Sequence, residues 1–207
     1  MTVQRAARRA EPTARPAFWM ETLRLAMREF VPSDFEDLYR LDSDPRVMKY
    51  VGGKAMTRDQ TQATMRRIVR YYRLYPDLGA WYTVGRDTGK FIGWVSLKYA
   101  GKSPDVEIGY RLLPEAWGQG FATEGATAML RYGFDDLDLD RIIGVTDPPN
   151  TASQRVLMKA GLADCGWGHY YDLRLRVFAA TNPNRMSPPG RPKGESAPKR
   201  AARRVVL

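Results

Sequence analysis

The sequence predicts a single α+β domain with a mixed, mostly antiparallel central sheet flanked by helices. The chain has 207 residues, which is enough for one well-packed domain. Hydrophobic residues make up 43% of it and charged residues 27%, as is usual for globular proteins. The hydrophobic periodicity alternates between strand and helix in the order β-α-α-β-β-β-α-β-α-β. Hairpins followed by a β-α-β unit favour a mixed sheet over a doubly wound one.

The first third of this pattern contains one strand and two helices. Apolar residues alternate with polar ones over Thr22–Phe30, which predicts a strand. A helix then opens near Ser33, which we expect to be its N-cap, with Glu36 completing a capping box. A second helix is predicted over Thr57–Tyr75, where Thr57 and Gln60 have the spacing of another capping box.

The rest of the pattern is dominated by strands. An Asp-Thr-Gly-Lys turn predicts a hairpin between the first two of them. The predicted strands are Trp81–Arg86, Phe91–Tyr99, Val106–Leu113 and Arg141–Thr146, with one or two more over Trp167–Ala180. The predicted helices are Ala122–Phe134 and Thr151–Ala160, the second of which is stopped by Gly161.

Basic residues concentrate at the two ends of the chain. The segments 1–19 and 182–207 hold eleven lysines and arginines against two acidic residues, while the whole chain has a net charge of +10. Both segments are rich in Ala, Pro and Gly and lack periodic apolar residues. We therefore predict disordered basic extensions around a folded domain at 20–181. Such extensions would bind polyanions only weakly and in a salt-dependent way.

Composition also disfavours several classes of protein. No run of about 18 apolar residues is present, so no transmembrane helix or membrane partner is predicted. The N-terminus lacks the apolar segment of a secretory signal, so a cytoplasmic location is the default expectation. Cys165 is the only cysteine and His169 the only histidine, which predicts neither a disulfide nor a metal site. A monomer and a homodimer are both compatible with the sequence.

One loop has the composition of a phosphate-binding segment. Trp117-Gly118-Gln119-Gly120-Phe121-Ala122 lies between a predicted strand and the start of a predicted helix. A helix N-terminus offers unpaired N–H groups and a positive dipole end, and glycine lets the backbone approach a phosphate closely. A tight β–α connection is the alternative interpretation. The loop matches neither a Walker sequence nor a dinucleotide fingerprint, because Thr123 stands where a third glycine is needed.

The surrounding sequence narrows the interpretation. The stretch from Val106 to Glu124 resembles motif A of the GNAT superfamily of N-acetyltransferases, with its VEIGYRLLPEAWGQGFATE sequence. About 25 residues later, NTAS at 150–153 and LMKAGL at 157–162 resemble the N-x-x-S and L-x-K-x-G-F elements of that superfamily. The similarity extends over roughly residues 20–180 and is greatest to the ribosomal-protein N-terminal acetyltransferases (RimJ/RimL-like).

The resemblance implies a fold and a cofactor site. Acetyl-CoA would lie in a split between two central strands, and no metal is implied. The residues implied to bind it are Leu112 and Leu113 along the pantetheine arm, Trp117, Gly118, Gln119, Gly120, Phe121, Ala122 and Thr123 around the pyrophosphate, and Asn150 and Ser153 near the pantetheine and the sulfur.

Two residues are candidates for catalysis of amine acetylation. Glu107, on a strand facing the cleft, would receive the proton of the attacking amine. The alternative is an exposed glutamate paired with Lys98 or Lys102. Many superfamily members carry a tyrosine seven residues after the asparagine, but this chain has Leu157 there. Ser153 is our candidate for the hydrogen bond to the departing sulfur, and a helix-surface serine is its alternative.

The acceptor is not fixed by these motifs. The first hypothesis is an N-terminal α-amine of a protein or peptide, and the second is a small amine such as an antibiotic, a polyamine or an amino acid. A non-catalytic acyl-CoA-binding module is a third hypothesis, which Glu107, Asn150 and Ser153 disfavour. A nucleic-acid-binding protein is a fourth, and it rests on the basic ends alone.

Overall fold

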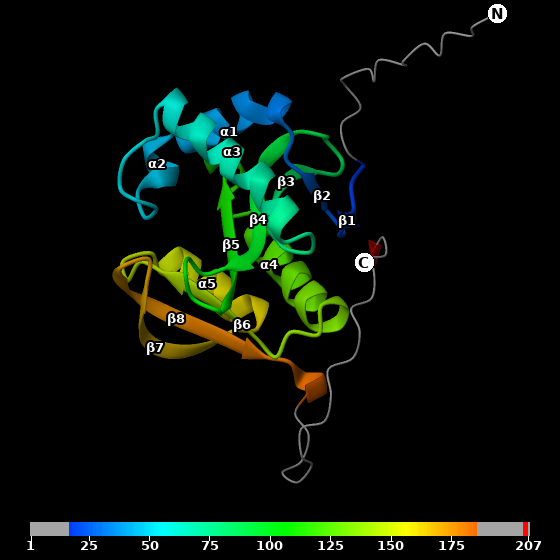
Figure 1. The fold of residues 1–207 in the computed structure, drawn as a ribbon, viewed down its shortest axis with the longest axis vertical. Helices are drawn as coiled ribbons and strands as arrows, with labels where there is room; N and C mark the ends of the chain where they lie inside the picture. The colour runs from blue at the N-terminus through cyan, green and yellow to red at the C-terminus, as the bar shows by residue number, and fades with distance from the viewer. Residues whose placement is uncertain (1–16, 186–204, 207) are drawn as a thin grey trace, which may run out of the picture.

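A computed structural model describes residues 17–185 and 205–206 of the chain. Its centre is a sheet that runs through the molecule (Figure 1). In chain order the strands are β1 (Met20–Glu21), β2 (Leu25–Glu29), β3 (Gly79–Gly85), β4 (Phe91–Tyr99), β5 (Val106–Leu112), β6 (Arg141–Thr146), β7 (Ala163–Tyr170), β8 (Leu173–Thr181) and β9 (Val205–Val206).

The topology of the sheet agrees with the predicted fold class. Its strand order is β7-β8-β6-β5-β4-β3-β2-β1-β9. Among the described strands, only the β5–β6 and β1–β9 pairs are parallel, and every other neighbouring pair is antiparallel. A parallel pair needs a crossover connection. Between β5 and β6, a helical segment that packs on the sheet makes this crossover.

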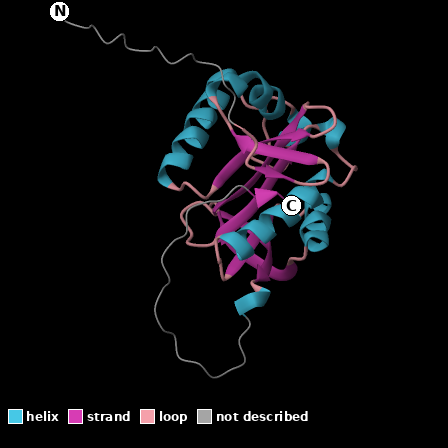
Figure 2. Ribbon diagram, turned by 90° about the vertical axis from the view of Figure 1, so that its right-hand side faces the viewer, coloured by secondary structure: helices cyan, strands magenta, loops and turns pink. Residues whose placement is uncertain are grey.

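Helices cover both faces of the sheet (Figure 2). The α-helices are α1 (Phe35–Asp42), α2 (Pro45–Met48), α3 (Arg58–Leu74), α4 (Phe121–Arg131) and α5 (Thr151–Ala160). Shorter helical turns are η1 (Pro32–Asp34), η2 (Pro114–Ala116), the π-helical η3 (Tyr132–Asp136) and η4 (Pro183–Arg185). The helices α1 and α3 contact β3 and β4 on one face, and α4 and α5 pack against each other on the opposite face.

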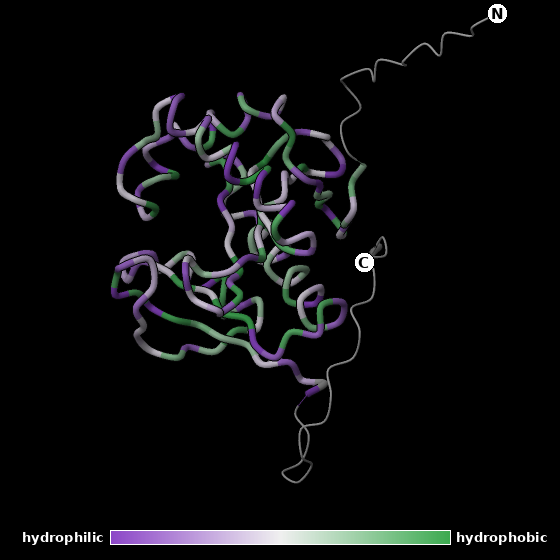
Figure 3. The backbone as a smooth tube through the Cα atoms, viewed as in Figure 1, coloured by the Kyte–Doolittle hydropathy of each residue, from purple (hydrophilic) through white to green (hydrophobic). Residues whose placement is uncertain are grey.

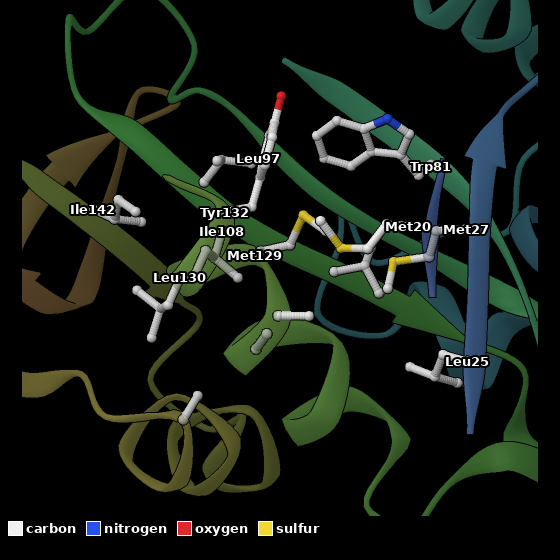
Figure 4. Packing of buried hydrophobic residues seen from close by; sticks show 14 of the residues in the cluster. Met20, Leu25, Met27, Trp81, Leu97, Ile108, Met129, Leu130, Tyr132 and Ile142 are labelled. Carbon is white, nitrogen blue, oxygen red and sulfur yellow. The ribbon is translucent and has the colours of Figure 1, made fainter. Parts of the chain in front are cut away.

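Each face of the sheet has its own hydrophobic core. The larger cluster joins strand residues such as Met27, Val95 and Ile108 to Met129 of α4 and Leu157 of α5 (Figure 4). The smaller cluster joins the other face to α1 and α3. Successive residues of one strand therefore belong to opposite cores, because neighbouring side chains of a β-strand point to opposite faces of the sheet. Hydrophobic segments accordingly run through the strands and α4 (Figure 3).

Several elements coincide with their predicted bounds. The strands Phe91–Tyr99 and Arg141–Thr146 and the helix Thr151–Ala160 are found as expected. Thr57 caps α3, and its side chain accepts from the Gln60 amide while the Gln60 side chain accepts from the Thr57 amide. These segments have strong periodicity and unambiguous end signals, which explains the agreement.

Other elements differ from the prediction. Ser33 is not the N-cap of the first helix, because it lies inside a 3-10 turn that precedes α1. The carboxylate of Asp34, and not the side chain of Ser33, accepts a hydrogen bond there, from the Val31 amide. The short helix α2 was missed, although the side chain of Asp44 caps it by accepting from the Arg46 amide. The C-terminal strands begin four residues earlier than expected, at Ala163, and form a hairpin.

Packed residues extend slightly beyond the predicted domain bounds of 20 and 181. Trp19 contacts Trp81 and Tyr132 in the larger core, with ring centroids 5.0 and 4.8 Å away. Asn182 is fully buried, and Arg185 pairs with two aspartates before β6. The predicted disorder of the basic ends concerns residues that lie mostly outside the described part of the chain. Within the described part, no helix is both long and apolar enough to cross a membrane.

One buried ion pair stabilises the N-terminal part of the fold. Arg28 of β2 is 2% exposed and Asp34 is 1% exposed. Two hydrogen bonds of 2.6 and 2.8 Å join the guanidinium to the carboxylate, and the guanidinium stacks on Tyr82 at 3.9 Å. The pair fixes the connection between β2 and α1, because Asp34 also binds the Val31 amide.

Removing one partner of this pair should destabilise the protein strongly. In Asp34→Ala the guanidinium of Arg28 stays buried without its counter-ion, so we expect the free energy of unfolding to fall by about 3–5 kcal/mol. Urea unfolding followed by circular dichroism measures it. The control is Glu36→Gln, which breaks the exposed Glu36–Arg58 pair and should leave the free energy of unfolding almost unchanged. Equal losses in the two variants would contradict the prediction.

Candidate active site

The two central strands β5 and β6 separate soon after they begin. Their parallel pairing is limited to Val106 with Ile142 and Glu107 with Ile143. Beyond this point β5 remains paired with β4 up to Leu112, and β6 remains paired with β8 up to Thr146. The sheet therefore opens into the split that the family resemblance implied.

A cavity of about 890 Å³ occupies this split. It is lined by residues of the α2–α3 connection, α3, β4, β5, the end of β6, α5 and the β7–β8 hairpin. Glu107, Asn150 and Ser153 all line it, so the structure brings together three residues that the sequence analysis singled out. Side chains from both faces of β5 reach the cavity, since Glu107 and Tyr110 point to opposite sides of the strand.

Glu107 is buried in a small polar network. It is 7% exposed. Its Oε2 accepts a hydrogen bond from the hydroxyl of Tyr171 and lies 3.5 Å from Nζ of Lys98, and that ammonium group donates to the Tyr171 hydroxyl over 3.0 Å. Glu107 thus pairs with Lys98, as the structural interpretation expected. It is also buried and lines the cleft, as the catalytic interpretation expected.

Tyr171 belongs to an unusual hairpin turn. Tyr171 and Asp172 connect β7 and β8 with φ angles of +57° and +61°. Such left-handed conformations cost roughly 1–2 kcal/mol per residue outside glycine. Burial of the hydroxyl raises the pKa of Tyr171, and the adjacent Glu107 charge raises it further. Tyr171 was not among the candidate site residues, because a two-residue turn without glycine or asparagine has no hairpin signature in the sequence.

Ser153 is held by two neighbours at the start of α5. Its amide donates to Oδ1 of Asn150 over 3.1 Å, so Asn150 is the N-cap of the helix. Its hydroxyl lies 2.8 Å from the Tyr110 hydroxyl, and either oxygen can donate. Tyr110 also donates to the Ser153 carbonyl over 3.0 Å. Burial raises the pKa of Tyr110, so its hydroxyl remains protonated at neutral pH.

Tyr110 was not a candidate on the sequence alone. It lies within the predicted strand Val106–Leu113, and in the structure it is partly buried against the larger core. Only the meeting of β5 with α5 places its hydroxyl beside Ser153. The Leu157 side chain lines the same cavity but offers no polar group there.

The glycine loop lies outside this cavity, at the N-terminus of α4. Gly118 and Gly120 have φ angles of +74° and +82°, and Gly120 is the N-cap of the helix. The loop is fixed from outside by Arg24, whose guanidinium donates to the Gln119 carbonyl over 2.8 Å and pairs with Glu124. The first amides of a helix have no intrahelical partner, so this N-terminus can bind an anion.

The end of β5 differs in part from the expected pantetheine contacts. The amide of Leu113 donates to Ile92 of β4, so the backbone of Leu113 faces away from the split. Because backbone groups alternate sides along a strand, Leu112 faces the split. Its carbonyl already accepts from the Trp117 indole over 2.8 Å. Among the backbone groups of these two leucines that were expected to bind the pantetheine arm, the amide of Leu112 is the one directed toward β6.

Two residues set aside on the sequence lie away from the cavity. Cys165 and His169 are both exposed on β7. Among residues 17–185, no group of three His, Cys, Asp or Glu side chains is arranged to hold a metal ion.

Comparison with known families identifies one family model. The model described as the acetyltransferase (GNAT) domain matches residues 24–163. Among curated proteins, the FsC-acetyl coenzyme A-N(2)-transacetylase of Aspergillus fumigatus is 34% identical over 186 residues, which cover 84% of this chain and 73% of that protein. The uncharacterized N-acetyltransferase YoaA of Bacillus subtilis is 34% identical over 145 residues, covering 69% and 81%.

Solved structures of acetyltransferases share the fold. An acetyltransferase from Agrobacterium tumefaciens superposes with a TM-score of 0.70 at 23% identity, covering 84% of this chain and 99% of that one. The ribosomal-protein-S5-alanine acetyltransferase from Vibrio fischeri gives 0.64 at 18%, with coverages of 81% and 98%. The aminoglycoside acetyltransferase AAC(6')-Ib in complex with coenzyme A gives 0.65 at 18%, with coverages of 76% and 94%.

The raised pKa of Tyr110 predicts a loss of stability in alkali. The unfolded chain releases a tyrosine proton near pH ~10, whereas the folded chain holds the Tyr110 proton to higher pH. This contribution to the free energy of unfolding is fully present below pH ~10. It decreases by up to about 1.4 kcal/mol per pH unit as the pH rises further. Above pH ~10, the free energy of unfolding should fall more steeply for the wild type than for Tyr110→Phe.

Urea unfolding at a series of pH values measures this difference. The two curves should run parallel between pH ~8 and ~9, which serves as the internal control. Curves that remain parallel through pH ~11 would show that the folded chain releases the Tyr110 proton as readily as the unfolded one.

Proposed function

Because the chain belongs to the GNAT acetyltransferase family and is an acetyl-CoA-dependent N-acetyltransferase, we propose that its acceptor is the N-terminal α-amine of a protein or peptide. The observation on which this acceptor class rests is the network that surrounds Glu107. The alternative is a small-molecule amine, and relatives by fold include proteins named for both kinds of acceptor.

In the proposed reaction, a neutral amine attacks the thioester directly. The amine nitrogen bonds to the acetyl carbon, the carbon–sulfur bond breaks, and the electron pair remains on sulfur as a thiolate. Glu107 receives the proton that the amine loses, directly or through water. Its burial in the cavity and its position on the face of β5 that α3 covers support this role.

We assign the hydrogen bond to the departing sulfur to Ser153. Its hydroxyl lines the cavity at the N-terminus of α5, where the helix dipole also favours negative charge. The Tyr110 proton, which is directed to the Ser153 carbonyl, would turn to the Ser153 hydroxyl oxygen 2.8 Å away and so leave the serine proton free to point toward the cavity. Tyr110 would then be a positioning residue. This pair supplies a hydroxyl donor in a chain that has Leu157 where many superfamily members have a tyrosine.

The state of Glu107 favours an α-amine over an alkyl amine. Lys98 and Tyr171 already engage its Oε2, so among the described side chains Oε1 is the oxygen left for an acceptor. An α-amine titrates near ~8 and is partly neutral at physiological pH, whereas a lysine-type amine titrates near ~10.4. An acceptor amine that is already partly neutral asks less of the base, so a carboxylate that Lys98 and Tyr171 also engage suits the α-amine better.

We propose that acetyl-CoA is bound by two parts of the split. The amides of Gly118 to Ala122, with Thr123 beside them, lie at the N-terminus of α4 and suit the pyrophosphate, whereas the amide of Trp117 already donates to the Pro114 carbonyl over 3.1 Å. The Leu112 amide faces the split and suits the pantetheine arm, which would then pass Asn150 and Ser153. We also propose that the chain belongs to the RimJ/RimL-like branch and that its functional domain spans residues 20–181.

Acceptor-dependent thiol release from acetyl-CoA tests the proposal. The full chain is assayed with peptides that have free N-termini, with the same peptides blocked at the N-terminus, and with a panel of polyamines, aminoglycosides and amino acids. We expect release with free peptides and none with blocked ones. Glu107→Gln should lower kcat by about 10²–10⁴-fold. Ser153→Ala should lower it by about ten-fold or more, since it removes a hydrogen bond to a charged group.

Two variants control for non-specific effects. Glu36→Gln makes the same change at an exposed position of α1, and Thr151→Ala removes an exposed hydroxyl from the first turn of α5. Both should retain wild-type kcat. Turnover of small amines without turnover of any peptide would refute the proposed acceptor, and unchanged kcat in Glu107→Gln would refute the proposed base.

The glycine loop generates a separate prediction about acetyl-CoA. In Gly120→Ala the residue at φ +82° becomes strained, and the new Cβ would lie 3.3 Å from Nη2 of Arg24. The displaced loop amides should raise the KM for acetyl-CoA by about ten-fold, the equivalent of one or two lost hydrogen bonds. Gly89→Ala, in the β3–β4 turn at φ +63° with open space around it, is the matched control for strain alone. An equal change of KM in both variants would contradict the assignment of the loop.

A further inference from the structure

The cavity in the split is lined by more positive than negative charge. Its acidic residues are Glu107 and Asp147, and its basic residues are Lys49, Arg67, Lys98, Arg111 and Arg174. The folded part of the chain is close to neutral, so this excess is local to the cavity.

Two of the five cations are neutralised within the protein. Arg111 pairs with Asp42, a fully buried carboxylate behind the cavity wall, and its guanidinium stacks on Trp94 at 5.1 Å. Lys98 pairs with Glu107 at 3.5 Å. These two groups are part of the wall and of the proposed catalytic network.

The other three cations have only neutral partners in close contact. Arg67 donates to the Thr64 hydroxyl over 2.9 Å. Lys49 lies 5.0 Å from the centre of the Tyr50 ring, and the guanidinium of Arg174 lies 4.7 Å from the Trp167 ring. Among the described residues, none of these three forms a salt bridge, although the charge of Arg67 acts on Asp42 at longer range.

These three cations come from opposite sides of the cavity. Lys49 directly follows α2 and Arg67 lies on α3, whereas Arg174 lies on β8 just after the hairpin turn. In Figure 1, α2 and α3 form the upper part of the molecule and the β7–β8 hairpin the lower part, with β5 between them. All three side chains are exposed, so they form a positively charged rim around the entrance rather than a buried site.

The rim is separate from the proposed phosphate-binding loop. None of the residues Trp117 to Thr123 lines this cavity. Cations placed for the pyrophosphate would be expected around the N-terminus of α4, where Arg24 lies. The pantetheine arm, which we place in the same cavity, carries no charge, so the charge of the rim is left for the acceptor that enters beside Glu107.

We infer that the acceptor carries negative charge close behind its reacting amine, as in a peptide whose N-terminal residue is followed by aspartates or glutamates. This inference rests on the proposed peptide acceptor and adds its charge. Three exposed cations attract such a peptide to the entrance and raise its association rate. The same charges repel polycationic acceptors, such as polyamines and aminoglycosides. Tyrosine and tryptophan rings beside Lys49 and Arg174 limit the positions that these cations occupy.

Matched peptides test the inference. Three peptides share one N-terminal serine and one length, and carry acidic, neutral or basic residues at positions two to four. The full chain should acetylate the acidic peptide with kcat/KM about ten-fold above that of the neutral one, and the basic peptide more slowly still. The preference should shrink toward unity in about 0.5 M salt, where the Debye length is near ~4 Å.

Two arginine variants provide the specific readout. Arg67→Gln should reduce the ratio of kcat/KM for the acidic peptide to kcat/KM for the neutral peptide by about two- to three-fold. Arg66→Gln is the matched control, since Arg66 is exposed on the same helix and does not line the cavity. Circular dichroism confirms that both variants are folded.

The outcomes separate this inference from the function on which it rests. Acetylation of all three peptides with equal kcat/KM would overturn the inference and leave the peptide acceptor intact. Failure to acetylate any peptide would overturn both. A raised KM for acetyl-CoA in Arg67→Gln, with the peptide preference unchanged, would overturn the inference by assigning the rim to the cofactor.

Discussion

The separation of β5 from β6 is the constraint on which the rest of the site depends. Two parallel strands that stay paired would satisfy each other's backbone groups and close the sheet. Here the pairing ends after Glu107 and Ile143, while each strand keeps its other neighbour. The interruption leaves the Leu112 amide facing the split, and it places the start of α5 beside Tyr110 in the middle of β5. Glu107 is the last residue of β5 that pairs with β6, so it lies at the apex of the split.

The two cores explain how the sheet tolerates this interruption. The larger core continues across the split, because Ile108 of β5, Ile142 of β6 and Leu157 of α5 belong to one cluster. The smaller core fastens α1 and α3 to β3 and β4 on the other face. The larger core therefore holds the two halves of the sheet together where β5 and β6 no longer pair. The buried Arg28–Asp34 pair serves the same purpose for the chain that leads into α1.

The sequence predicted those parts of the fold that have regular patterns. The period of β4 and β6, the caps of α3 and α5, and the motif around the glycine loop can be read from neighbouring residues, and they place Glu107, Asn150 and Ser153 in one cavity. Contacts between distant segments could not be predicted in this way. Tyr110 meets Ser153 across 43 positions, and Tyr171 meets Glu107 across 64. Neither tyrosine has a local signal that distinguishes it from a core or loop residue.

The alternation of side chains along β5 has a consequence for the order of events. Glu107 points to the face that α3 covers, and Tyr110 points to the face that carries α5, yet both reach the same cavity. The cavity is thus a passage through the sheet rather than a pit in one side of it. Two reactants that reach such a passage from opposite faces of the sheet can be bound at the same time. The geometry therefore suits a ternary complex in which the amine meets the thioester directly.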